Sequence, residues 1–231
     1  MSESSLHQFR LPNETSDYRA ARDSLLAAEI ELRRQTEKVA AMRRDLPPGG
    51  PVREDYVFDE LGGDGSVRQV PLSALFGDKD TLAVYSFMYG PAMENACPSC
   101  TAVLDSLNGA SQHVNQPISF VVVAKSPIER IAAYAKERGW SHLRLLSSAS
   151  NAFNRDYGGE TESGGQMPAL NVFTRKDGTV RHFYNAELLF APWDPGQHPR
   201  HVDVIWPVWG LLDFTPSGRP DDWEPQRSYD T

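Results

Sequence analysis

The most regular hydrophobic pattern in the chain lies near its N-terminus. Hydrophobic side chains recur at every seventh position of a stretch that is otherwise rich in charge, at Tyr18, Leu25, Leu32, Val39 and Leu46. This spacing predicts an amphipathic helix from Thr15 to about Leu46, which the sequence Pro47-Pro48-Gly49-Gly50 ends. Two interpretations stay open: the stripe packs on its own domain, or its heptads pair residues 18–46 of two copies in a homodimer.

After residue 50 the pattern changes to short apolar runs separated by turn residues. It predicts a hairpin at 56–70, strands at 81–88, 118–124 and 143–146, and a second hairpin at 169–184 with Asp177-Gly178 in its turn. Helices are predicted at 100–114 and 127–138. The strand–helix–strand connection from 81 to 124 requires parallel pairing, whereas hairpins are antiparallel. The sequence therefore predicts a mixed α/β sheet flanked by helices.

The pattern also divides the chain into three parts. Residues 1–50 form an N-terminal tail and the long amphipathic helix, residues 51–214 form the α/β domain, and residues 215–231 form a polar C-terminal tail. The domain closes with an aromatic segment at 202–214, expected to be a helix that Pro207 interrupts. The polar tail is expected to be loosely held.

Composition narrows the classes of function. Of 231 residues, 40% are hydrophobic, which is enough for a core, and the net charge of −8 argues against a nucleic-acid partner. The longest apolar runs are too short for a membrane span. The start, Met1-Ser-Glu-Ser-Ser-Leu-His7, lacks the basic and apolar regions of a secretory signal, so a cytoplasmic location is expected.

The candidate chemistry lies where the 81–88 strand gives way to a helix. The only two cysteines occur there, in the sequence Cys97-Pro98-Ser99-Cys100. A thiol at the start of a helix meets unpaired backbone N–H groups and the positive end of the helix dipole, which lower its pKa. Cys97 is thus the candidate nucleophile of a redox dithiol, and Cys100 is the candidate resolving thiol.

Two other interpretations of this cysteine pair stay open. The cysteines supply half of a zinc site, and His198 and His201 offer a His-x-x-His pair for the other half. Alternatively, the thiols are inert, and the protein is a redox-inactive binding or dimerisation protein.

The order of these features resembles the thioredoxin superfamily. The resemblance rests on a strand that ends at Phe87, the Cys-Pro-Ser-Cys helix start, and Met167-Pro168 before a strand–Asp-Gly–strand hairpin. More narrowly, the chain from Leu11 to Gly218 resembles a bacterial family named domain of unknown function 899, whose members are described as predicted dithiol–disulfide oxidoreductases. The matching segments are Ser86–Pro91, Cys97–Cys100, Gly139-Trp140, Asn151–Asn154, Asp156–Gly158 and Leu211–Gly218.

The resemblance implies a thioredoxin-like fold and a thiol–disulfide exchange activity. It implies that Pro168 is cis and packs opposite the dithiol, and that Met167 lines a substrate groove. We assign Pro98, Ser99 and Glu94 to the same groove. The implied partners are a disulfide-containing protein or small thiol and an unknown reductant, with no organic cofactor and no metal.

The chain also departs from its relatives. The buried acid that thioredoxin carries before its dithiol has no counterpart in the strand, and Glu94 is the nearest candidate. Glu94 also stands where the peroxiredoxin signature Pro-x-x-x-Thr-x-x-Cys has its Thr, so peroxidase chemistry is not expected.

Overall fold

The computed structural model describes residues 6–229, and its backbone divides into two compact units. One unit runs to Pro47 and the other begins at Pro48. Each unit is described by itself.

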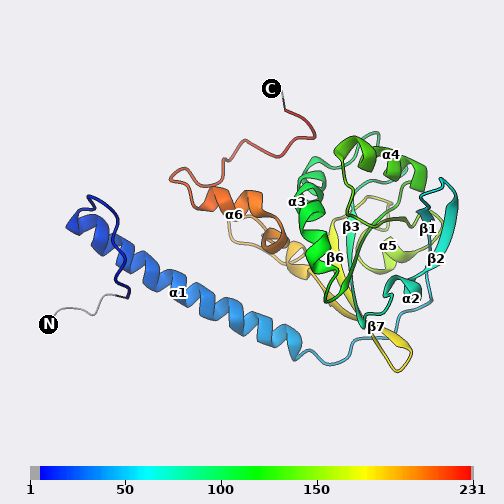
Figure 1. The fold of residues 1–231 in the computed structure, drawn as a ribbon, viewed down its shortest axis with the longest axis horizontal. Helices are drawn as coiled ribbons and strands as arrows, with labels where there is room; N and C mark the ends of the chain where they lie inside the picture. The colour runs from blue at the N-terminus through cyan, green and yellow to red at the C-terminus, as the bar shows by residue number, and fades with distance from the viewer. Residues whose placement is uncertain (1–5, 230–231) are drawn as a thin grey trace. The chain divides into compact units, whose positions relative to one another are not determined.

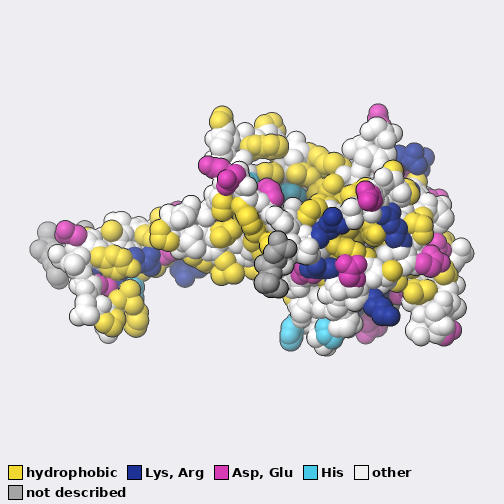
Figure 2. All heavy atoms as spheres, turned by 90° about the horizontal axis from the view of Figure 1, so that it is seen from above, with side chains coloured by type: hydrophobic (Ala, Val, Ile, Leu, Met, Phe, Trp, Pro, Cys, Tyr) yellow, Lys and Arg dark blue, Asp and Glu magenta, His cyan; other side chains and the backbone are white. Residues whose placement is uncertain are grey.

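The first unit is built on helix α1 (Ser16–Arg44), so the predicted long helix is confirmed. Thr15 caps it, because its hydroxyl accepts a hydrogen bond of 3.2 Å from the backbone N–H of Tyr18. No residue of α1 is buried. Figure 2 shows hydrophobic side chains along the helix, and the exposed members of the heptad stripe include Tyr18, Leu25 and Leu32.

The second unit is organised around a seven-stranded sheet of order β2-β1-β5-β4-β3-β6-β7. Its strands are β1 (Val57–Leu61), β2 (Val67–Pro71), β3 (Thr81–Phe87), β4 (Ser119–Ala124), β5 (Leu145–Ser147), β6 (Ala169–Lys176) and β7 (Thr179–Asn185). β3, β4 and β5 are parallel neighbours, and β6 and β7 add antiparallel strands beside β3. The predicted mixed sheet and both predicted hairpins are confirmed.

Helices cover both faces of this sheet, as Figure 1 shows. They are α2 (Leu72–Leu75), α3 (Pro98–Val114), α4 (Ile128–Arg138), α5 (Phe153–Asp156) and α6 (Pro207–Asp213), with short 3-10 turns η1 (Glu187–Leu189) and η2 (Asp203–Ile205). Gly139 ends α4 in the left-handed conformation (φ 71°), where a residue without Cβ avoids strain. The parallel β3–α3–β4 crossover and the β6–β7 hairpin confirm the thioredoxin-like fold class.

The two faces of the central strand β3 supply two separate cores. Tyr85 and Phe87 pack with α3, α4 and the aromatic segment before and in α6, whereas Leu82 and Val84 pack with α2 and α5. Alternation along a strand produces this division, because successive side chains point to opposite faces. Every position of β3 from Leu82 onward is buried.

The C-terminal tail differs from the expectation of a loosely held segment. It forms no helix or strand between Arg219 and Tyr229, but Trp223 packs against the α3-side core and Pro225 is buried. The sequence did not predict this packing, because most residues of the tail are polar.

None of the helices between residues 6 and 229 has both the length and the apolar character that a membrane span requires.

Candidate functional site

The dithiol lies at the end of β3 and the start of α3. The chain leaves β3 at Phe87 and folds back beside the end of this strand at Cys97, whose backbone N–H donates to the carbonyl of Met88 at 3.0 Å. Cys97 is the residue before the first helical position of α3, and Pro98 takes that position, where its missing N–H removes no helical hydrogen bond. The backbone N–H and the hydroxyl of Thr101 both bond the Cys97 carbonyl, at 3.0 and 2.8 Å. Cys97 is therefore fixed on both sides.

Arg130 of α4 holds the loop between Gly90 and Glu94. Its guanidinium donates to three backbone carbonyls of this loop, including those of Gly90 at 3.2 Å and Glu94 at 2.7 Å. It also lies 4.2 Å from the centre of the Tyr89 ring. One cation thus satisfies the carbonyls of a loop that has no secondary structure. No feature of the sequence singles out Arg130 for this role.

The two thiols are free and differ in exposure and in pKa. Cys97 is half-buried, whereas Cys100 has an exposed fraction of 2%. The Cys100 thiol, acting as a hydrogen-bond donor, is the main cause that lowers the pKa of Cys97 to about 6, and the backbone N–H groups of Cys100 and Ser99 help. Burial and the nearby Glu224 carboxylate act in the opposite direction. For Cys100, the hydrogen bond to Cys97 and burial raise the pKa well above its ordinary value.

Tyr85 lies beneath the dithiol, on the face of β3 that carries Phe87. Its side chain is 1% exposed, and its hydroxyl is hydrogen-bonded to Cys100. This bond acts to lower the pKa of Cys100, against the stronger effects that raise it. Burial raises the pKa of Tyr85 itself well above its usual range, so the hydroxyl stays protonated. The buried polar neighbour of the dithiol is therefore a tyrosine.

Glu94 does not take the place of the buried acid that thioredoxin carries. Glu94 is exposed, and it interacts with Arg130 through its backbone carbonyl. The expectation that Glu94 is the nearest counterpart of that acid was wrong, because the group that reaches Cys100 comes from inside the strand, at Tyr85. Tyr85 lies two residues before Phe87 on the same face of β3, so the alternation of side chains along the strand could have placed it there from the sequence.

Met167 and Pro168 lie at the same edge of the sheet as the dithiol. Ala169 is paired with Ser86, so the residues before it continue toward the end of β3. The Gln166 side chain approaches Gly90 so closely that a Cβ there would lie 2.7 Å from it. The described backbone contains no cis peptide bond, so the expectation that Pro168 is cis was wrong. Its trans bond leads straight into β6.

The four residues of the zinc alternative are not brought together. His198 stacks on the Trp209 ring at 5.7 Å, and His201 is half-buried with its Nε2 atom unpaired. Between residues 6 and 229, no group of three or more His, Cys, Asp or Glu side chains is arranged to hold a metal.

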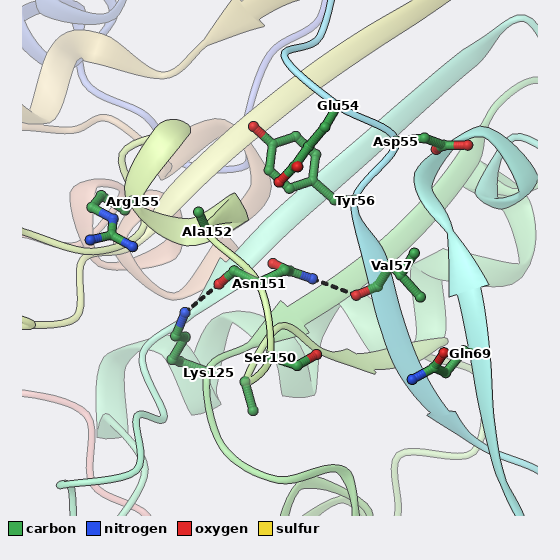
Figure 3. Close-up of a pocket in the computed structure, with 11 residues that line it drawn as sticks. Glu54, Asp55, Tyr56, Val57, Gln69, Lys125, Ser150, Asn151, Ala152 and Arg155 are labelled. Carbon is green, nitrogen blue, oxygen red and sulfur yellow. Dashed lines mark hydrogen bonds between the residues drawn. The ribbon is translucent and has the colours of Figure 1, made fainter.

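A separate open pocket of about 650 Å³ lies between β1 and the loop before α5 (Figure 3). Asn151 joins its walls, because its Nδ2 atom donates to the Val57 carbonyl at 2.6 Å while its own carbonyl accepts from Lys125. Its Oδ1 atom also accepts from the Phe153 backbone at 3.0 Å. None of the predicted site residues is among the eleven that line this pocket. The Asn151–Asn154 motif thus has a structural role here.

Comparison with known proteins identifies the family. The sequence model of a family described as "Bacterial protein of unknown function (DUF899)" matches residues 9–230. The chain belongs to the DUF899 family. No curated protein matches the sequence of this DUF899 chain.

Solved structures similar to the DUF899 chain include several peroxiredoxins. A cysteine-to-serine mutant of peroxiredoxin Q from Xanthomonas campestris is 12% identical with a TM-score of 0.48, covering 71% of this chain and 96% of its own. The peroxidoxin BcpB from Mycobacterium tuberculosis is 20% identical with a TM-score of 0.42, covering 70% and 94%. The reduced 2-Cys peroxiredoxin from Plasmodium vivax is 16% identical with a TM-score of 0.43, covering 68% and 93%.

Proposed function

We propose that this protein is a thiol–disulfide oxidoreductase in which Cys97 is the nucleophile and Cys100 is the resolving thiol. The observation that carries the proposal is the placement of the pair, with Cys97 half-buried just before α3 and Cys100 buried in its first turn, and the two pKa shifts run in opposite directions. Cys97 is partly exposed with a pKa of about 6, so it is mostly thiolate at neutral pH. Cys100 is buried and its raised pKa keeps its proton until it is needed. Dithiol exchange requires this division between an attacking and a waiting thiol.

The reaction balances with the two thiols alone. The Cys97 thiolate attacks one sulfur of the substrate disulfide, the substrate S–S bond breaks, and the other sulfur leaves as a thiolate that takes a proton from water. Cys100 then loses its proton and attacks the Cys97 sulfur, which releases the second substrate thiol. The Cys97–Cys100 disulfide that remains is reopened by a reductant, which supplies two electrons and two protons. No organic cofactor or metal takes part.

We assign the substrate groove to Pro98, Ser99, Glu94, Met167 and Pro168. The close approach of Gln166 to Gly90 supports this assignment, because it links the segment before β6 to the loop before the dithiol. We also propose a cytoplasmic location, where such a dithiol is kept reduced.

The proposal is tested by turnover with a small disulfide. The protein is expected to catalyse the reduction of bis(2-hydroxyethyl) disulfide by dithiothreitol. Cys97→Ser should abolish this activity, whereas Cys100→Ser should stop after the first step and accumulate a mixed disulfide on Cys97. Equal rates for the wild type and Cys97→Ser would refute the proposed activity.

We further propose that α1 pairs two copies of this chain in a homodimer. The support is the seven-residue repeat of hydrophobic side chains on a helix that buries none of its residues. The alternative function also depends on this homodimer, since the alternative is a redox-inactive binding or dimerisation protein. An intact dimer that fails the turnover test would favour that alternative.

A further inference from the structure

The C-terminal segment Arg219–Tyr229 is fixed at its start by an ion-pair cluster. The guanidinium of Arg219 is 2.6 Å from Asp203 Oδ2 and 2.7 Å from Asp213 Oδ2, and its side chain is only 6% exposed. It also lies over the Trp209 ring at 5.4 Å. A largely buried, doubly paired arginine holds its partners more firmly than an exposed single ion pair.

The middle of the segment is held by aromatic packing. The ring of Trp223 meets Trp209 edge-on at 5.8 Å, and it packs on the same core cluster that Cys97 contacts. Pro225 follows and is buried. The middle of the segment therefore lies against the α3-side core.

The end of the segment lies beside the start of α3. Arg138 of α4 donates to the carbonyl of Arg227, and Asp105 holds the same guanidinium from the other side. A pocket of about 420 Å³ lies between the end of the segment and the helices α3 and α4. Its lining includes Pro98, the residue that follows the nucleophile.

The charge of Glu224 agrees with a segment that runs near the dithiol. The Glu224 carboxylate raises the pKa of Cys97, a Coulomb effect that falls off with distance. Glu224 stands between Trp223 and Pro225, the two residues that anchor the segment. Glu224 is exposed, and its charge has the smallest of the effects on the pKa of the Cys97 thiol.

We propose that this C-terminal segment is a specificity-determining wall of the dithiol site, which admits small disulfides to Cys97 and excludes disulfides of folded proteins. The inference rests on the proposed exchange activity for its substrate class. A folded protein must bring its own backbone against the surface around Cys97, and the segment occupies that surface on the Pro98 side. A small disulfide needs only the space around the sulfur.

Access to Cys97 is measured with two maleimides that share one reactive group. In the reduced Cys100→Ser chain, N-ethylmaleimide is expected to react roughly tenfold faster, relative to a free-cysteine peptide, than a maleimide on a long polyethylene glycol chain. Trp223→Ala and Arg219→Gln, each in that background, should shrink this ratio severalfold. Phe214→Ala is the matched control, because Phe214 is 84% exposed, and it should leave the ratio unchanged. A ratio equal to that of the peptide, unchanged in both variants, would overturn the wall.

Substrate preference is measured on the unaltered dithiol. The wild type should reduce bis(2-hydroxyethyl) disulfide far faster than insulin, and Trp223→Ala and Arg219→Gln should raise the relative rate with insulin. Equal use of both substrates by the wild type would overturn the wall and leave the exchange activity standing. Inertness toward both substrates, with a labelling ratio that still falls in the variants, would overturn the exchange activity and keep the restricted access.

The position of the segment has its own reporter. Glu224→Gln should lower the pKa of Cys97, read from the pH dependence of thiolate absorbance, because the opposing negative charge is removed. The groups that act on this thiol are Cys100, the backbone N–H groups of α3 and Glu224, and the variant changes only the last. Asp222→Asn is the control and should not shift it. No difference between the two variants would overturn the placement of the Glu224 carboxylate beside Cys97.

Discussion

The thiolate state of Cys97 depends most on a single neighbour, the Cys100 thiol. Its hydrogen bond is the largest of the effects that move the pKa of Cys97 from an ordinary 9.0 to about 6. That fall corresponds to about 4 kcal/mol in favour of the thiolate. A hydrogen bond to a charged group contributes about 1.5–3 kcal/mol. Cys100→Ala removes this donor, so it should raise the pKa of Cys97 by roughly one to two units.

The assay is the rate of alkylation of reduced protein by iodoacetamide as a function of pH. In the wild type, the rate should rise through pH 6 and level off, since only the thiolate reacts. The midpoint should move toward alkaline pH in Cys100→Ala and less in Cys100→Ser, which keeps a hydroxyl donor. A wild-type midpoint near an ordinary thiol value, or one that Cys100→Ala leaves in place, would show that the Cys100 thiol does not stabilise the Cys97 thiolate.

The same shift couples Cys97 to stability. Because its pKa is lower in the folded than in the unfolded chain, its contribution is present above the unfolded value and is lost as pH falls through about 6. The free energy of unfolding of reduced wild type should therefore rise with pH in this window more steeply than that of Cys97→Ser, as urea unfolding at each pH would show.

Three further predictions concern residues away from the nucleophile. Tyr85→Phe removes the hydroxyl that bonds Cys100, so it should raise the pKa of Cys100 and slow release of the mixed disulfide, measured by stopped-flow with a small disulfide; an unchanged second step would contradict this role. Arg130→Gln removes the charged donor to three loop carbonyls and should lower the free energy of unfolding by about 2 kcal/mol in urea, whereas exposed Glu129→Gln should not. Leu32→Glu puts a charge on the hydrophobic stripe of α1 and should convert the proposed dimer to a monomer, measured by sedimentation. A wild-type chain that is already monomeric would contradict the proposed dimer.

Much of the fold follows from local pattern. The seven-residue repeat, the strand at 81–88 with apolar residues on both faces, and the Asp177-Gly178 turn each specify their element without help from distant residues. Asp177 and Gly178 both have positive φ in the observed turn, which explains why that dipeptide predicts a hairpin.

The site was less predictable because its parts meet only in three dimensions. The position of Cys97 and Cys100 at the start of a helix could be predicted from the sequence. The strand pattern places Tyr85 on the same face as Phe87, but it does not show that the Tyr85 hydroxyl reaches Cys100. Arg130 is one charge among many on α4, and only the folded loop gives it partners. Trp223 is an isolated aromatic residue in a polar tail, a weak signal that marks the segment as packed.

Dithiol exchange at Cys97 and Cys100 is tested most directly by equilibrating the reduced protein with glutathione and oxidised glutathione, followed by mass spectrometry. A redox dithiol should lose two hydrogen atoms from the peptide that contains Cys97 and Cys100, and Cys100→Ser should carry a glutathione adduct on Cys97. A wild-type protein that keeps both thiols free, or that accumulates a stable glutathione adduct without closing the Cys97–Cys100 disulfide, would contradict this exchange.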